Sequence, residues 1–224
     1  MLYCIGGSPC SGKSTVAERL SKFGFPQNGQ TQQNRQTHNY GQTHNNGLVY
    51  FKADDHMFPG MEWALKKGCP ECVKYFEMSV DEIWLREPFE QFLAEREIWR
   101  ELFPYINSKL LETSAENPEY DIIAEGAAFM PSLAEAYGVD PSKYVCLVPT
   151  KEFQREKYAL RTWVSQILEG VSDKQRAFEN WMKRDELFAE AMLEEARALK
   201  LRFVVNSGEL NEDELFGLVA GLVR

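Results

Sequence analysis

Short apolar runs alternate with longer amphipathic stretches along this chain of 224 residues, and the alternation predicts an α/β fold. The short runs are typical of strands buried on both faces of a sheet; they lie at 2–5, 48–53, 120–126, 144–148 and 202–205. The stretches with apolar residues at helical spacing lie at 14–23, 79–114, 153–168, 172–200 and 215–223. We therefore expect a five-stranded parallel sheet with helices on both faces.

Residues 26–47 interrupt this alternation with three hexapeptides rich in Gln, Asn and Thr. The segment has almost no apolar side chains whose burial could offset the entropy lost on ordering, so we expect a low-complexity flexible insertion over 27–47. His38 and His44 lie within it, but they recur with the repeat and lack acidic or thiol neighbours. A repeat is therefore a better interpretation of the two histidines than a metal site.

Between the second and third predicted strands, residues 56–118 are expected to form a helical insertion on the substrate side. Gly60, Gly68 and Pro70 predict loops and helix fragments over 59–72. Cys69 and Cys72 form a single C-x-x-C without a second pair at zinc-finger spacing. Even with His56 as a third ligand the set is incomplete for structural zinc, so two unpaired thiols are the preferred interpretation.

Residues 151–175 are expected to form a helical lid, followed by a helix that a capping box at 172–175 opens. Arg155 and Arg161 on the lid are candidate catalytic residues, because mobile cations neutralise charge on a transferring phosphoryl group. Glu152 and Glu156 lie close enough in sequence to form ion pairs with lid cations, so a salt-bridged surface helix is the alternative.

Composition narrows the classes of partner. The net charge of −9 argues against nucleic acid or an acidic membrane, because both favour a basic protein face. No apolar run reaches the roughly 20 residues of a membrane span, and the apolar N-terminal residues belong to the first predicted strand. Five scattered cysteines indicate a reducing compartment. We expect one cytoplasmic domain over 1–224, monomeric or homodimeric, acting on a small molecule.

The first strand leads into a glycine-rich turn with the spacing Gly7-x-x-x-x-Gly12-Lys13-Ser14. Its glycines allow consecutive N–H groups to face a polyphosphate, and the positive end of the following helix adds to the attraction. Lys13 is suited to the β- and γ-phosphates, and the Ser14 hydroxyl to Mg²⁺. The sequence therefore predicts a site for ATP or GTP, with these nucleotide-binding residues: Gly7, Ser8, Pro9, Cys10, Ser11, Gly12, Lys13, Ser14 and Thr15.

Acidic residues follow the second and third strands, where ligands of open parallel sheets bind. Asp54 and Asp55 are candidates to receive the proton of a substrate hydroxyl, although an aspartate there also caps a helix well. His56 is either a substrate contact or a partner of a loop carbonyl. Glu125 is expected to support Mg²⁺, and Gly126 after it indicates a close backbone approach; the alternative is a solvent-exposed glutamate.

The glycine-rich motif and the acidic strand ends resemble the P-loop kinases of small molecules, which include uridine, nicotinamide riboside, gluconate and shikimate kinases. The resemblance implies a three-layer P-loop NTPase fold with a helical lid, and it implies ATP and Mg²⁺ as cofactors. Residues 54–58 are similar to the D-D-F-F stretch of riboside and uridine kinases, with His56 in place of an aromatic residue. Asn206, in the turn after the fifth strand, would lie near the base, and the absence of a guanine signature favours ATP.

The acidic strand ends also bear on the acceptor. Nucleoside monophosphate kinases hold the acceptor phosphate with arginines near these strands, whereas carboxylates there would repel a phosphate and suit a neutral hydroxyl. We therefore expect ATP-dependent phosphorylation of a nucleoside- or sugar-like metabolite, with Asp54 as the base. Two alternatives remain: a monophosphate kinase that uses Arg86, Arg96 or Arg100, and a nucleotide-dependent switch or adaptor.

Overall fold

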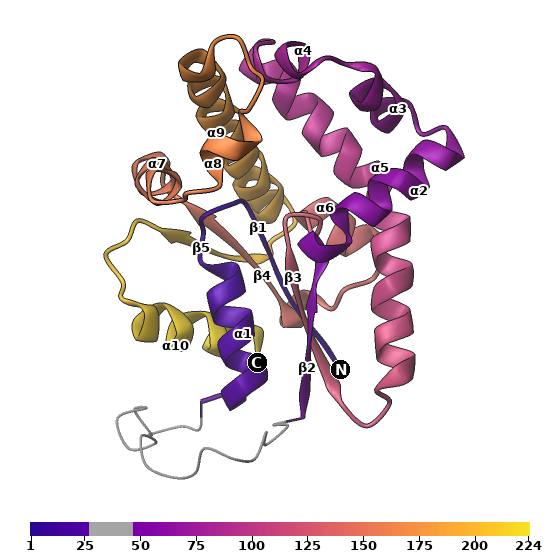
Figure 1. Ribbon diagram of the computed structural model, residues 1–224. Coiled ribbons are helices and arrows are strands. Elements are labelled where there is room, and N and C mark those ends of the chain that lie inside the picture. The colour runs from indigo at the N-terminus through magenta and orange to yellow at the C-terminus, as the bar shows by residue number, and fades with distance from the viewer. Residues whose placement is uncertain (27–46) are drawn as a thin grey trace.

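The computed structural model describes residues 1–26 and 47–224 (Figure 1). The expected insertion at 27–47, with its two histidines, therefore lies outside the described residues apart from Gly47. Among the described helices, none is both long enough and apolar enough to cross a membrane.

Five parallel strands form one sheet, as the apolar runs predict. They are β1 (Leu2–Gly7), β2 (Leu48–Lys52), β3 (Asp121–Gly126), β4 (Tyr144–Pro149) and β5 (Arg202–Asn206). The strand order is β2-β3-β1-β4-β5, so β1 lies in the centre. Its residues Ile5 and Gly7 are in register with Glu125 of β3 and Leu147 of β4. The glycine-rich turn therefore leaves the middle of the sheet, with the end of β3 beside it.

Layers of helices cover both faces of the sheet (Figure 1). Successive side chains of a strand point to opposite faces. Tyr3 and Ile5 pack with α1 (Lys13–Phe23) and α10 (Glu212–Val223), whereas Cys4 packs in the core shared with α5 (Pro88–Glu116) and α9 (Lys174–Ala198). The expected helices on both faces are thus confirmed. A short helix, α6 (Pro131–Ala136), and a 3₁₀ turn, η3 (Pro141–Lys143), connect β3 to β4.

The region between β2 and α5 is more helical than the breakers in its sequence predict. A 3₁₀ turn η2 (Ala53–His56) leads into α2 (Met57–Lys67), and α3 (Pro70–Glu77) and α4 (Val80–Trp84) follow. The predicted helix fragments over 59–72 are therefore confirmed, with a break at Gly68 and Cys69, but the break expected at Gly60 is wrong. Gly60 lies inside α2, where a side chain would come within 3.3 Å of the Tyr105 ring, so the missing side chain serves the packing of α2 against α5.

The lid region contains two helices rather than the one predicted over 153–168: α7 (Lys151–Ala159) and α8 (Val164–Ile167). The predicted capping box at 172–175 is also wrong. Asp173 is the N-cap of α9, and its carboxylate accepts a hydrogen bond from the Arg176 amide. Ser172 instead donates its backbone N–H to the carboxylate of Asp81 in α4. The carboxylate of Asp173 is one residue nearer the helix, so it takes the capping role.

Candidate active site

The glycine-rich loop, residues 7–13, is a tight turn that side chains would disrupt. Gly7 has φ 147°, and a Cβ there would lie 1.9 Å from the Leu147 carbonyl oxygen. Gly12 has φ 96° and is the N-cap of α1, so no side chain caps this helix. Cys10, with φ 63°, is a non-glycine residue in the left-handed region. This backbone leaves the first amides of α1 for an external anion.

Lys13 and two serines of the loop are buried without strong partners. Lys13 is 5% exposed, and its ammonium donates only a long hydrogen bond of 3.4 Å to the Ser8 carbonyl. The hydroxyls of Ser8 and Ser11 are buried and have no hydrogen-bond partner. Buried polar groups of this kind are costly unless a ligand satisfies them. The loop therefore suits an anion with several oxygen atoms.

Asn206, the last residue of β5, stabilises the glycine-rich loop through a hydrogen bond. Its side-chain amide donates a 3.0 Å hydrogen bond to the Ser11 carbonyl and accepts one of 3.0 Å from the Gly208 amide. Asn206 does not line the cavity described below. The structure thus gives Asn206 a contact with the loop rather than with the ligand space.

Glu125 and Asp54 lie beside Lys13 at the ends of adjacent strands. Glu125 is fully buried; its Oε1 accepts a 2.9 Å hydrogen bond from the Tyr50 hydroxyl, and its Oε2 has no partner. Asp54 likewise has a buried Oδ1 without a partner. A side chain at Gly126 would lie 3.1 Å from that oxygen, so the close approach expected at Gly126 is confirmed. Two carboxylates with unpaired buried oxygens are suited to a cation or a hydroxyl proton.

Burial raises the pKa of Glu125, and the charge of Lys13 opposes that shift. Asp54 raises the pKa of Glu125 further, whereas hydrogen bonding to Tyr50 and Ser14 lowers it. These influences show that Lys13, Ser14, Asp54 and Glu125 share one electrostatic neighbourhood. The alternative interpretation of Glu125 as a solvent-exposed residue is therefore wrong.

The buried charge of Glu125 predicts a stabilising substitution. The pKa of this carboxyl is higher in the folded than in the unfolded chain, so its contribution to stability is present at acidic pH and lost as pH rises through the folded pKa. Glu125→Gln should therefore raise the free energy of unfolding at neutral pH, by roughly 0.5–2 kcal/mol. Urea unfolding at several pH values would show the gain shrinking toward acidic pH. Equal stability of variant and wild type at pH 7, with exposed Glu119→Gln as control, would contradict this prediction.

The loop opens on a cavity of about 720 Å³, within the usual range of small-molecule sites. Residues 9–15 form one wall, and the others come from the end of β2, from η2 and from α2, α3, α4, α5, α7, α8 and α9, with the segments next to them. The charged residues in its walls are Lys13, Lys52, Asp54, Arg86, Glu95, Arg161 and Arg184. The aromatic residues are Phe58, Tyr75, Trp84, Trp99, Tyr158, Trp163 and Trp181.

Two residues next to Asp54 do not reach this cavity. Asp55 forms a 3.1 Å ion pair with Lys52, and its side chain is 68% exposed. His56 stacks on Phe51 with ring centroids 4.9 Å apart, and burial lowers its pKa. Neither Asp54 nor Asp55 caps α2, because His56 is the N-cap and makes no side-chain cap bond. Of these three candidate substrate residues, the structure brings only Asp54 to the cavity.

The two lid arginines also separate. Arg155 forms a 2.8 Å ion pair with Glu179 on α9 and does not line the cavity. Arg161 lines the cavity, and its guanidinium carbon lies 5.0 Å and 5.3 Å from the ring centroids of Tyr158 and Trp163. Arg155 is therefore part of a surface ion pair, although with Glu179 rather than with the expected Glu152 or Glu156, whereas Arg161 lines the ligand space.

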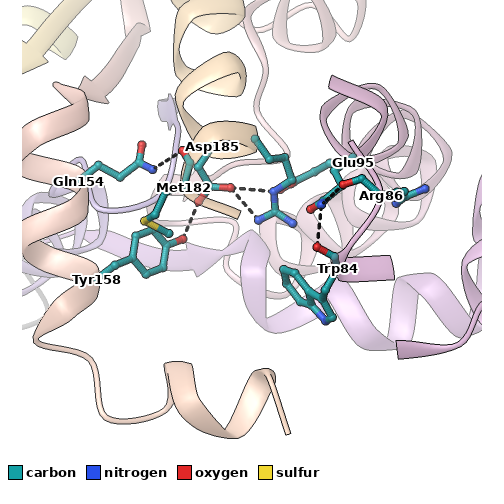
Figure 2. A network of polar contacts seen from close by, with 9 residues as sticks. Trp84, Arg86, Glu95, Gln154, Tyr158, Met182 and Asp185 are labelled. Atoms are coloured by element: carbon teal, nitrogen blue, oxygen red, sulfur yellow. Dashed lines mark hydrogen bonds and ion pairs between the residues drawn. The ribbon is translucent and has the colours of Figure 1, made fainter. Parts of the chain in front are cut away.

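Sequence reasoning missed a buried polar network on the far side of the cavity (Figure 2). Arg184 contacts the carboxylates of Glu95 at 2.7 Å and Asp185 at 2.6 Å, and the Tyr158 hydroxyl donates a 2.7 Å hydrogen bond to Asp185. The sequence did contain a signal for this network. Asp185 lies four residues after Trp181 and Glu95 four before Trp99, so both acids fall within apolar stripes.

Cys69 and Cys72 are unpaired thiols at the start of α3. Glu101 of α5 accepts hydrogen bonds from the Glu71 and Cys72 amides, and therefore caps this helix from outside. Within residues 1–26 and 47–224, no group of three or more His, Cys, Asp or Glu side chains is placed to hold a metal ion.

Comparison of the sequence with models of known protein families found no match, and comparison with curated proteins found no significant relative. What this site does is therefore inferred from its geometry and chemistry alone.

Proposed function

We propose that this chain is an ATP-dependent phosphotransferase that moves the terminal phosphoryl group of ATP to a hydroxyl of a small metabolite. One observation carries the proposal: the glycine-rich loop with Lys13 and the carboxylate of Asp54 line one end of a single cavity, and the buried carboxylate of Glu125 lies beside them. The five free thiols support action in a reducing compartment such as the cytoplasm.

The residues present fit ATP and Mg²⁺. Bound ATP supplies the phosphoryl group, and Mg²⁺ neutralises charge on its phosphates. The amides of the loop and the N-terminus of α1 would hold phosphate oxygens, and the buried Lys13 ammonium would lie among them. Ser14 and Glu125 are the residues suited to the metal or its water ligands. Arg161 would neutralise charge from the lid side.

Asp54 is the residue best placed to act on the acceptor. It lines the cavity, follows β2 directly, and presents a buried oxygen without a partner. In our proposal this carboxylate oxygen orients the acceptor hydroxyl. It takes the hydroxyl proton as the acceptor oxygen attacks the γ-phosphorus of ATP.

Phosphorylation of a nucleoside monophosphate is the second candidate, because an arginine does line the cavity. Of the three arginines considered for an acceptor phosphate, only Arg86 reaches it. Arg96 forms an ion pair with Glu195, and Arg100 forms one with Glu97. Arg184 also lines the cavity, but it is paired with Glu95 and Asp185. Arg86 beside the lining carboxylates of Asp54 and Glu95 is a weak site for a doubly charged phosphate, so a hydroxyl acceptor is favoured.

Purified protein with MgATP and a panel of free alcohols and nucleoside monophosphates would test this function through acceptor-dependent ADP release. We expect saturable turnover with an alcohol and none with the monophosphates. Tight ATP binding without any acceptor would favour a nucleotide switch or adaptor. Absence of nucleotide binding in the presence of magnesium would overturn the proposed function.

A further inference from the structure

The side of the cavity formed by α4, α5 and α9 combines aromatic rings with buried charge. We refer to Trp84, Glu95, Trp99, Trp181 and Arg184 as the acceptor chamber; all five line the same cavity as Asp54 and Lys13. These residues are not needed to hold a triphosphate on the glycine-rich loop. Their chemistry therefore bears on the molecule that receives the phosphoryl group.

Arg184 shares its positive charge between two carboxylates, those of Glu95 and Asp185. Asp185 is fully buried and does not line the cavity, so Glu95 is the carboxylate of the two that a ligand can reach. Burial raises the pKa of Glu95, Arg184 opposes this shift, and Asp185 and Asp54 add to it. Arg184 is the largest charge acting on Glu95, but it also pairs with Asp185, so a ligand cation would further relieve the cost of burying the Glu95 carboxylate.

Arg86 is the other cation on this side of the cavity, and its guanidinium contacts residues outside the chamber. Its guanidinium points away from Asp185 in Figure 2 and contacts the Met78 sulfur at 3.8 Å. It also lines a second cavity, whose other charged residues are Glu71, Lys74, Glu82, Glu90 and Glu97. Burial and the charge of Arg184 lower the pKa of Arg86, and Glu71 and Glu90 oppose that shift. Arg86 is thus stabilised by that second, acidic cavity.

The aromatic faces of the chamber attract positive charge. The ring centroids of Trp84 and Trp181 lie 4.9 Å apart. The guanidinium carbon of Arg184 lies 5.6 Å from the Trp84 centroid and 5.7 Å from that of Trp181. Trp99 adds a further indole to the same walls. Tryptophan is the best cation–π partner, most of all where water is excluded.

A third feature indicates a ligand with an oxygen atom. Trp181 is only 4% exposed, and its indole N–H has no hydrogen-bond partner among the described residues. An unsatisfied buried donor in the wall of a cavity is costly until a ligand acceptor reaches it.

The next inference rests on the proposed function. We propose that the acceptor is an amino alcohol, from a simple alkanolamine to an amino sugar, whose ammonium is held by Glu95 and the chamber tryptophans. The acceptor hydroxyl oxygen forms a bond to the γ-phosphorus while the bond from that phosphorus to the bridging oxygen of ADP breaks. The hydroxyl proton passes to Asp54. The amine stays protonated throughout and serves only for binding.

Matched acceptors that differ in charge test this proposal on the wild-type protein. Choline and 3,3-dimethyl-1-butanol have nearly the same shape, and D-glucosamine and D-glucose form a second pair. Acceptor-dependent ADP release should give a kcat/KM for the cationic member of at least one pair about 10- to 100-fold higher. Equal or better use of the neutral members, or the absence of both turnover and binding for every cationic member, overturns the proposal.

Tetramethylammonium tests the cation site without chemistry or nucleotide. It should quench tryptophan fluorescence saturably, at matched ionic strength with sodium, whether or not ATP is present. It should also compete with the acceptor and not with ATP. If a neutral alcohol is phosphorylated and tetramethylammonium does not bind, the inference about the chamber fails while the proposed function stands. If tetramethylammonium binds but no nucleotide does, the proposed function fails while the cation site in the chamber stands.

The variant Glu95→Gln separates a binding role from a structural one. The amide keeps the size of the side chain and an oxygen for Arg184 but loses the negative charge. KM for a cationic acceptor and the dissociation constant of tetramethylammonium should both rise about 30-fold or more, with kcat within about threefold of wild type. Glu97→Gln on the same helix, where Glu97 pairs with Arg100, should change neither. Unchanged affinities in Glu95→Gln would overturn the assignment.

Discussion

Replacing Lys13 with methionine should lower phosphoryl transfer by about 10²- to 10³-fold, the usual cost of removing one preorganised electrostatic contact. The ammonium has a single long hydrogen bond of 3.4 Å in the fold itself, so its charge serves the ligand more than the protein. Methionine fills a similar volume and removes a buried charge, so the fold should persist. Steady-state ADP release and thermal unfolding of the same preparation would measure both effects.

Lys22→Met is the matched control, because Lys22 lies on the same helix and its exposed side chain pairs with Glu18. It should retain activity within about twofold, as substitutions on an exposed surface usually do. Nucleotide affinity should fall in Lys13→Met and stay unchanged in Lys22→Met. Equal activity of the two variants would contradict the role given to Lys13.

The sheet could be predicted from sequence because its signals are local. Five short apolar runs sufficed to identify the strands, and strands buried on both faces leave few alternative structures. The meeting of Asp54 and Glu125 followed from the same reasoning, since the carboxyl ends of parallel strands share one edge. Their side-chain environments were not predictable, because the residues that act on Glu125, the hydrogen-bond donor Tyr50 and the charged Lys13, come from two other segments.

The sequence also did not indicate which side chains of the turn after β2 reach the cavity. Asp54, Asp55 and His56 are consecutive, yet a 3₁₀ turn sends only the first toward the cavity. Arg155 and Arg161 separate for a related reason, because α7 ends at Ala159, between the two arginines. The sequence of this region has helical spacing throughout, and nothing local in it marks that end of the helix.

The acceptor chamber was hidden for a different reason. Tryptophans at helical spacing are usually core residues, and Trp181 is indeed largely buried. What distinguishes them here is that charged residues from α5 and α9 interrupt the apolar stripes and meet only in three dimensions. Charged residues within an apolar helical stripe are therefore the sequence feature that indicates such a buried polar network.

Asp54→Asn should reduce kcat by about 10²- to 10⁴-fold, the usual contribution of a general base, while the KM for ATP stays nearly unchanged. Asparagine keeps the shape of the side chain but cannot take the hydroxyl proton. The expected loss is in the chemical step, because Asp54 lies on the cavity while the triphosphate is held by the glycine-rich loop. Single-turnover measurements with saturating MgATP would isolate that step from product release.

The neighbouring Asp55→Asn variant is a demanding control for this prediction. Asp55 differs from Asp54 by one position, is largely exposed, does not line the cavity, and pairs with Lys52. Its substitution should leave kcat within about threefold of wild type, because exposed ion pairs contribute little. If Asp54→Asn turned over its acceptor within a few-fold of wild type, or if Asp55→Asn were the more damaged of the two, then the proton would leave by another route and Asp54 would only orient the acceptor.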